Sequence, residues 1–244
     1  MLLAAAIAII FLAAIVRGYS GFGFSLLAIT SLSLIYRPAE IIPSIFLLEI
    51  AASLHLLPGL WRDIHWRSLI PLVIGTGIGT PVGLMFLTGI PAAPMQITLG
   101  LFVFVVTCLL WQGFALKSMP GNVISTAAGL AAGVANGAFG IGGPPVILFY
   151  FASPAGAIVG RATIVTYFLL TDAIGLGFFS NENLVTTGIL IRTLIFLPAL
   201  LAGVWLGARS FKNADPAVFR KWVLALLGLL AAISAAKGMY GLWS

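Results

Sequence analysis

Two glycine-rich segments are the parts of this sequence best suited to bind a small charged molecule. They comprise residues 17–23 and 136–145, and apolar sequence flanks both. Glycine lets the backbone turn and leaves amide groups unshielded by a side chain. A helix that begins directly after such a segment presents free N–H groups and the positive end of its dipole. Both segments therefore predict a site for a small oxyanion.

We expect the helices that begin near Phe24 and after Gly143 to converge near the centre of the protein. Pro144 and Pro145 suit the first turn of a helix, where a missing N–H group costs little. The residues predicted to contact the anion are Arg17, Ser20, Gly21, Gly23, Ser25, Asn136, Gly140, Gly142, Gly143 and Pro144. The alternative is that these small residues only allow helices to pack closely.

Arg17, Glu49 and Asp172 are charged residues within otherwise apolar sequence. A charge in apolar surroundings is costly unless it is paired or hydrogen-bonded. Arg17 can bind an anion through bidentate hydrogen bonds, or its long side chain can reach a polar boundary. Glu49 and Asp172 can carry protons, pair with Arg17 or Arg161, or join two helices by a structural hydrogen bond. We treat both as candidate proton-coupling residues.

The composition places these residues in a membrane protein. Of the 244 residues, 61% are apolar and 7% are charged, whereas an average soluble domain carries roughly 25% charged residues. We therefore expect an all-α polytopic membrane protein with helices of about 20 residues. The single cysteine, Cys108, excludes an internal disulfide and a cysteine metal cluster, and we expect no metal or cofactor. The net charge of +6 is expected to reflect basic cytoplasmic loops rather than nucleic-acid binding.

Apolar runs separated by polar, glycine or proline residues predict the helical segments. Their ranges are 2–16, 24–36, 38–58, 67–88, 94–114, 121–136, 141–152, 157–179, 186–208 and 217–240. In each half, the first two segments are short and meet at a glycine-rich segment. The other three segments of each half are long enough to span a membrane.

The two halves of the chain resemble each other in sequence. Gly18, Gly21 and Gly23 match Gly137, Gly140 and Gly142 at an offset of 119 residues. The run beginning at Phe46 matches the run beginning at Phe168 at an offset of 122, and Arg67 matches Arg192 at an offset of 125. The matches keep their order along the chain. They predict two repeats, residues 1–116 and 117–244, within one transmembrane domain.

The basic residues predict how these repeats are oriented. If each short pair crosses the membrane an even number of times, most of the basic residues fall on one side. These residues are Arg62, Arg67, Lys117, Arg161, Arg209, Lys212, Arg220 and Lys221, and the opposite side holds Arg37, Arg192 and Lys237. If each pair is one broken span, the division is nearly even. The positive-inside rule favours the first case, so we expect inverted repeats with both termini outside.

The glycine motif also carries a resemblance to a known family. Its most specific part is Gly137-x-x-Gly140-x-Gly142-Gly143-Pro144, followed by long apolar helices. Over essentially its whole length, the chain resembles the sulfite exporter TauE/SafE family. The first segment is a weaker copy, because Phe24 and Ser25 stand where the second half has Gly143 and Pro144. The resemblance implies a bacterial inner-membrane permease for small sulfur-containing anions or organosulfonates, and it leaves the substrate and direction of transport open.

The sequence therefore predicts a secondary transporter of a small oxyanion, with sulfite or an organosulfonate as the leading substrates. The sequence contains no G-x4-G-K-[ST] nucleotide-binding loop, so coupling would come from protons or the membrane potential, unless transport is passive. In the expected mechanism the two repeats rock about a central site. The expected partners are the small anion, the lipid bilayer and protons.

Two other functions compete with transport. Gly18-Tyr19-Ser20-Gly21 has the G-x-S-G form of an intramembrane serine hydrolase, with Ser20 as nucleophile and His55 as base. The matching residues 137–140 keep the glycines and lack the serine, which argues for a backbone requirement and against an enzyme. The remaining alternative is a membrane subunit that does not transport by itself.

Overall fold

The computed structural model describes residues 2–112, 119–152 and 156–210, with three isolated positions at 228, 232 and 236. These residues form helices and contain no strand. The helices are α1 (Leu2–Ser20), α2 (Phe24–Leu32), α3 (Pro38–Leu56), η1 (Leu57–Gly59), η2 (Trp61–Asp63), α4 (Trp66–Gly89), α5 (Ala92–Gln112), α6 (Asn122–Phe139), α7 (Gly143–Ala152), α8 (Gly156–Asn181) and α9 (Thr187–Ser210). Of the predicted segments, 217–240 lies outside the continuously described ranges, as do Lys117, Lys212, Arg220, Lys221 and Lys237.

The protein is an all-α polytopic membrane protein. Five of its described helical segments are long and apolar enough to cross a membrane: Leu2–Ser20, Pro38–Gly59, Trp66–Gly89, Ile158–Asn181 and Thr187–Ser210. The first of these corrects the prediction of a short helix over residues 2–16. In both halves the first helix is longer than predicted, because α1 continues through Gly18 and α6 continues through Gly137.

Glycines allow the first helix of each half to pack tightly against a helix of the other half. A Cβ at Gly18 would overlap the carbonyl oxygen of Val204 in α9, and a Cβ at Gly137 would overlap that of Thr80 in α4. Glycines of α4 and α9 allow the same close approach, since a Cβ at Gly79 would overlap the carbonyl oxygen of Leu130 in α6 and one at Gly207 would overlap that of Ile15 in α1. At Gly18 and Gly137 the repeated glycine is therefore explained by close helix packing.

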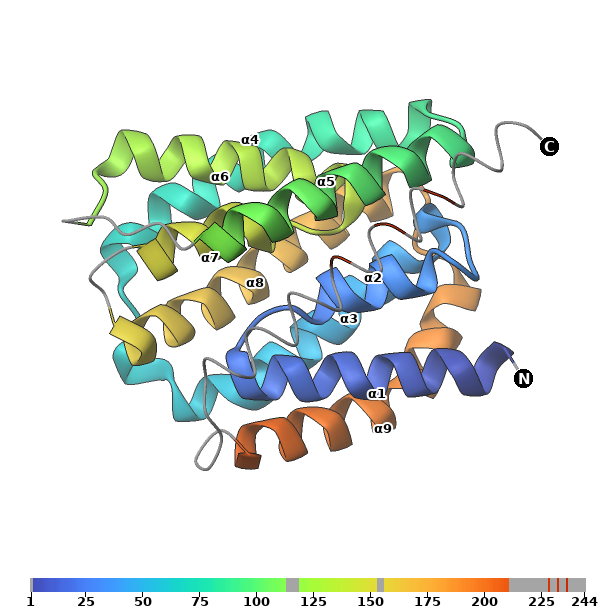
Figure 1. Ribbon diagram of the computed structural model, residues 1–244, viewed down its shortest axis with the longest axis horizontal. Helices are drawn as coiled ribbons and strands as arrows, with labels where there is room; N and C mark the ends of the chain where they lie inside the picture. The colour runs from blue at the N-terminus through green and yellow to red at the C-terminus, as the bar shows by residue number, and fades with distance from the viewer. Residues whose placement is uncertain are drawn as a thin grey trace.

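The two glycine-packed pairs, α1 with α9 and α4 with α6, run in opposite directions. Gly18 lies against residues 204–208 and the earlier residues of α1 lie against Gly203, so α1 and α9 are parallel. The same comparison shows that α4 and α6 are parallel. In Figure 1, α1 and α9 run from right to left, whereas α4 and α6 run from left to right. This arrangement supports inverted repeats, which remain a prediction.

The chain reverses direction at each glycine-rich segment, so α1–α2 and α6–α7 are hairpins (Figure 1). Gly21, Gly23 and Gly140 have φ values of 81°, 88° and 66°, in the left-handed region that other residues rarely adopt. The amide of Gly21 donates to the carbonyl of Arg17, and the amide of Gly140 donates to that of Asn136. The two hairpins thus end their first helix in the same way, at positions 119 residues apart.

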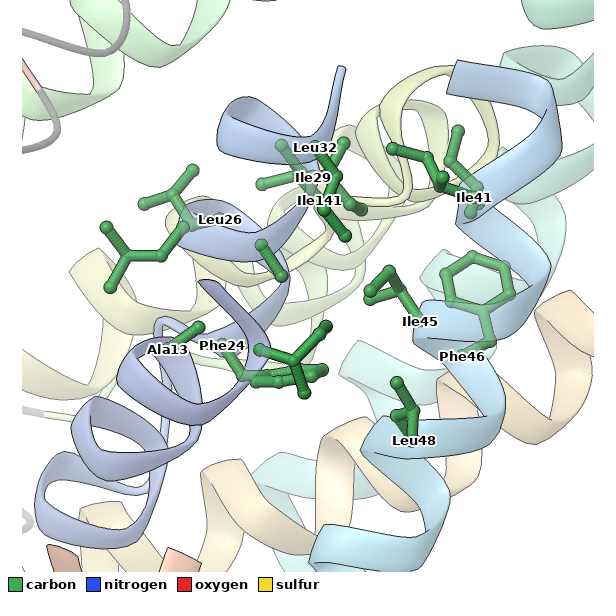
Figure 2. Close-up of a cluster of buried hydrophobic side chains, with 14 of the residues drawn as sticks. Ala13, Phe24, Leu26, Ile29, Leu32, Ile41, Ile45, Phe46, Leu48 and Ile141 are labelled. Carbon is green, nitrogen blue, oxygen red and sulfur yellow. The ribbon is translucent and has the colours of Figure 1, made fainter. Parts of the chain in front are cut away.

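A hydrophobic cluster holds the first hairpin against α3 and the second glycine segment. Figure 2 shows Ile29 and Leu32 of α2, Ile45 of α3 and Ile141 in one cluster. All four side chains are buried. A Cβ at Gly140 would lie 2.7 Å from Cδ1 of Ile29. The second glycine segment therefore rests directly on the short helix that begins after the first.

Basic residues at the helix ends are distributed unequally between the two ends of the bundle. The C-terminal ends of α3 and α9 and the N-terminal end of α4 lie at the same end of the bundle (Figure 1), and Arg62, Arg67 and Arg209 belong to these regions. Arg37 precedes α3 at the opposite end. This separation is consistent with the orientation inferred from the positive-inside rule, and the positions of the termini relative to a membrane remain a prediction.

Candidate anion site

Arg17 and Glu49 form an ion pair in the interior of the bundle. Arg17 lies in the last turn of α1 and Glu49 lies on α3. Nη2 of Arg17 is 2.9 Å from Oε2 of Glu49, and the two side chains are 0% and 1% exposed. Arg17 therefore does not extend to a polar boundary, which was the alternative to anion binding. Glu49 pairs with Arg17, which was one of its predicted roles beside proton transfer and a structural hydrogen bond between helices.

The guanidinium of Arg17 contacts three further residues: Gly21 in the turn before α2, Ser53 on α3 and Phe168 on α8. Nη1 donates to the carbonyl of Gly21 at 2.9 Å, and Nη2 donates to Oγ of Ser53 at 2.7 Å. Its Cζ lies 4.7 Å from the centroid of the Phe168 ring, a distance typical of a cation–π contact. Among the described residues, no hydrogen-bond acceptor contacts Nε. The guanidinium is thus held in place with one donor still available.

Glu49 also caps the helix that begins after the first glycine segment. The amide of Ser25, in the first turn of α2, donates to Oε1 of Glu49 at 3.1 Å. A helix N-terminus attracts negative charge because its first amides lack partners within the helix. The carboxylate of Glu49 therefore occupies the position where the sequence predicted a bound oxyanion.

The second glycine segment is buried and carries fewer amide donors than we expected. Gly143 begins α7, but Pro144 and Pro145 have no N–H group. Asn136 is 2% exposed, and none of the described residues accepts a hydrogen bond from its Nδ2. Gly142 packs against the Asn136 side chain, since a Cβ at Gly142 would lie 2.9 Å from the Cβ of Asn136. Hydrogen bonding at this segment would depend on Asn136 and very few amides.

Phe168 contacts residues of both glycine-rich segments. Its ring covers Arg17 on one side, and a Cβ at Gly143 would lie 2.8 Å from Cζ of the same ring. The sequence predicted that the two N-termini converge on one polar site. The structure instead brings both glycine segments against one aromatic ring, with the charged pair on the side of the first.

Asp172 is a second buried carboxylate near the pair. It lies on α8, is 2% exposed, and is close enough to Glu49 and Arg17 to interact with both electrostatically. Its Oδ2 has no hydrogen-bond partner among the residues that the structure describes. Two carboxylates and one guanidinium thus share the interior near the first glycine segment.

Arg161 reaches the first glycine segment, although the sequence placed it among the basic residues of a cytoplasmic loop. It lies in the second turn of α8, and its Nη2 donates to the carbonyl of Gly18 at 2.8 Å. A Cβ at Gly21 would lie 2.7 Å from Cγ of Arg161. The sequence did indicate that Arg161 lies on a helix and not in a loop, because residue 161 falls inside the predicted helix 157–179.

Ser20 does not have the surroundings of a nucleophile. Its Oγ lies 2.7 Å from the carbonyl of Val16 and 2.8 Å from that of Phe22, within its own turn. His55, the proposed base, is an exposed residue of α3. A serine activated for attack requires a base within hydrogen-bond reach, and the structure gives Ser20 backbone partners in place of one.

The candidate residues are shielded from solvent in this conformation. Ser25 is 5% exposed and Asn136 is 2% exposed, and the glycines of both segments are buried. A pocket of about 270 Å³ lies elsewhere, where Glu40 near the start of α3 meets Asn183 and Arg192. Apart from the half-buried Ser20, these candidate residues are thus closed off from solvent in this structure.

The sequence of the chain matches a known protein family. The family model described as sulfite exporter TauE/SafE matches residues 6–234. This chain belongs to the TauE/SafE family. Members of this family are membrane transporters and not enzymes, so Ser20 and His55 are not a catalytic pair here.

Two curated TauE/SafE relatives are similar to most of the chain. The probable sulfite/organosulfonate exporter TauE of Cupriavidus necator is 25% identical over 225 residues, covering 88% of this chain and 84% of the relative. The probable inner membrane transporter protein TsaS of Comamonas testosteroni is 26% identical over 190 residues, covering 75% of this chain and 77% of the relative. No solved structure matches the chain.

Proposed function

We propose that this protein is a secondary transporter of a small sulfur oxyanion, with sulfite or a short organosulfonate as its substrate. The observation that carries the proposal is Arg17, a fully buried guanidinium at the first glycine segment. A guanidinium inside a membrane protein is costly and usually serves a function. The name of the Cupriavidus necator relative supports this substrate class, and the name of the Comamonas testosteroni relative supports an inner-membrane location.

The anion site would consist of Arg17, the start of α2 and the second glycine segment. Ser25, Gly21 and Gly23 belong to the first part, together with Ser20, whose hydroxyl now bonds within its own turn. Asn136, whose Nδ2 has no acceptor in the described ranges, would donate from the other side. The remaining candidate contacts of the second part are Gly140, Gly142, Gly143 and Pro144. Because the site is occluded in this structure, transport requires it to open toward each side in turn.

Glu49 and Asp172 would couple anion movement to protons. Both lie near Arg17 in the interior, and carboxylates at such depth are typical of proton relays in transporters. Coupling to protons would let a pH difference drive the anion across the membrane. The two predicted repeats, 1–116 and 117–244, would supply the inverted framework on which the site opens.

A binding screen tests the proposed substrate class. The purified protein would be heated with sulfite, sulfate, thiosulfate, acetate and short sulfonates, and the melting temperature recorded. A ligand that binds only the native state raises the apparent stability. We expect sulfur oxyanions to raise the melting temperature of the wild type and to leave that of the Arg17→Gln variant unchanged. The proposal fails if no sulfur oxyanion stabilises the wild type.

A further inference from the structure

The carboxylate of Glu49 has the contacts that a bound oxyanion would have. One oxygen faces the guanidinium of Arg17 at 2.9 Å, and the other accepts the amide of Ser25 at the start of α2 at 3.1 Å. A guanidinium and a helix N-terminus are the two groups that proteins most often present to an oxyanion. A residue of the protein itself therefore fills the most positive part of the candidate site.

Stability alone does not account for this arrangement. A buried ion pair loses the hydration of both charges, and replacing such a pair with apolar residues is often neutral or stabilising. Nε of Arg17 also has no acceptor within the part of the chain that the structure describes. These features suit a guanidinium that exchanges one acceptor for another.

The second half of the chain lacks the same set of residues. At the offset of the glycine segments, Asn136 takes the place of Arg17 and Pro144 takes the place of Ser25. At the offset of the following helix, Thr171 takes the place of Glu49 and Gly175 takes the place of Ser53. At the aligned positions the second half therefore lacks the guanidinium, the amide and the carboxylate, while its own buried carboxyl group, Asp172, lies one residue after the position of Glu49.

We propose that Glu49 is an internal competitor, which the transported anion displaces from Arg17 and from the N-terminus of α2. The proposal rests on the proposed function, since it assigns the regulation of the same site. When the site is empty, Glu49 neutralises Arg17. When the anion binds, it takes over Arg17 and the amide of Ser25, and the Glu49 side chain moves away from both.

Displacement changes the proton content of the site. The charged groups near Glu49 are Arg17 on α1 and Asp172 on α8, and Arg161 on α8 lies near Arg17 and donates to the Gly18 carbonyl. Helix α2 has no titratable residue. On α9, Arg192 binds the Glu40 carbonyl at the other end of α3, and Arg209 lies in the last turn beside Trp205. Once the anion holds Arg17, the buried Glu49 carboxylate has lost its ion-pair partner and lies near the carboxyl group of Asp172. It takes one proton from water and becomes a neutral acid. A monovalent anion and a proton thus enter together, and the charge of the site stays constant.

The experiment measures binding of methanesulfonate and sulfate to the purified protein at several pH values. Neither anion changes its charge across roughly pH 5 to 8, the range in which a proton-linked site is usually examined. For the wild type we expect affinity to fall by about tenfold per pH unit once Glu49 is ionised, because each binding event takes up one proton. The Glu49→Gln variant has no competitor, so we expect it to bind at least about tenfold more tightly at neutral pH, with no pH dependence.

Glu40→Gln is the matched control, since Glu40 lies on the same helix but is exposed. We expect it to behave like the wild type. If Glu49→Gln does not fold, calorimetry on the wild type in buffers of different ionisation enthalpy counts the protons directly, and we expect one for each anion bound. Binding without proton uptake, or equal affinity and pH dependence in Glu49→Gln and the wild type, would overturn the inference while leaving the proposed function intact. Absence of binding to both proteins would overturn the two together.

Discussion

Phe168 of α8 covers the guanidinium of Arg17 of α1, with Cζ 4.7 Å from the ring centroid. The contact joins the buried ion pair of the first half to α8, a helix of the second half. Because the same ring packs against Gly143, a movement of α7 or α8 would change the surroundings of Arg17. The buried charge is thus sensitive to the arrangement of both halves.

Removing Arg17 should reveal the energy of the buried pair. Arg17→Gln leaves the carboxylate of Glu49 without its cation, and we expect it to reduce stability by about 3–5 kcal/mol. Adding Glu49→Gln to that variant should recover part of the loss, because the uncompensated charge is removed. Denaturant unfolding in detergent measures both effects. Equal stability of Arg17→Gln and the wild type would contradict a buried ion pair.

Alanine substitutions at two glycines of α4 should have different effects on stability, depending on what each glycine contacts. A Cβ at Gly79 would overlap the carbonyl of Leu130 in α6, whereas one at Gly77 has nothing within 4 Å. We expect Gly79→Ala to cost about 1–3 kcal/mol by forcing the helices apart. Gly77→Ala should be neutral or stabilising by up to about 1 kcal/mol, since alanine favours the helix. Thermal unfolding of the two variants gives the comparison, and similar losses would argue against close packing of α4 on α6.

Asp172 should affect proton coupling more than folding. Asp172→Asn replaces a buried carboxyl group whose Oδ2 has no partner among the described residues with an amide of the same size, so we expect the variant to fold. We expect a pH gradient to drive much less anion uptake into proteoliposomes containing it. Glu182→Gln, just beyond the end of α8, is the control and should retain gradient-driven flux. Gradient-driven flux at the wild-type rate in Asp172→Asn would remove this residue from the coupling mechanism.

Much of the fold could be predicted because membrane helices follow from apolar length alone. The predicted segments 38–58 and 67–88 agree with α3 and α4 within a few residues. The ends of α1 and α6 were predicted too early, since glycine usually indicates a break. Gly18 and Gly137 instead continue their helices, because a neighbouring helix passes too close for any side chain. That requirement depends on tertiary packing and is invisible in local sequence.

The candidate site was predicted in its residues but not in its contacts. Arg17, Glu49 and Asp172 stood out because charge is rare in apolar sequence. Nothing local indicates that Glu49 faces Arg17 or caps α2, because these contacts join segments far apart in the chain. The position of Arg161 within the predicted helix 157–179 argued against a loop, but its contact with Gly18 also joins distant segments and could not be predicted. Their roles in binding an anion remain predictions.

The reciprocal packing of α1 on α9 and of α4 on α6 has a mechanical consequence. Each glycine-packed pair contains one helix from residues 1–116 and one from residues 117–244. Separating the two halves along the sequence boundary would pull apart both of these tight interfaces. A motion that preserves them carries α1 with α9 and α4 with α6, so its rigid bodies are interleaved along the chain. A motion that keeps both tight interfaces therefore cannot move residues 1–116 and residues 117–244 as two separate rigid bodies.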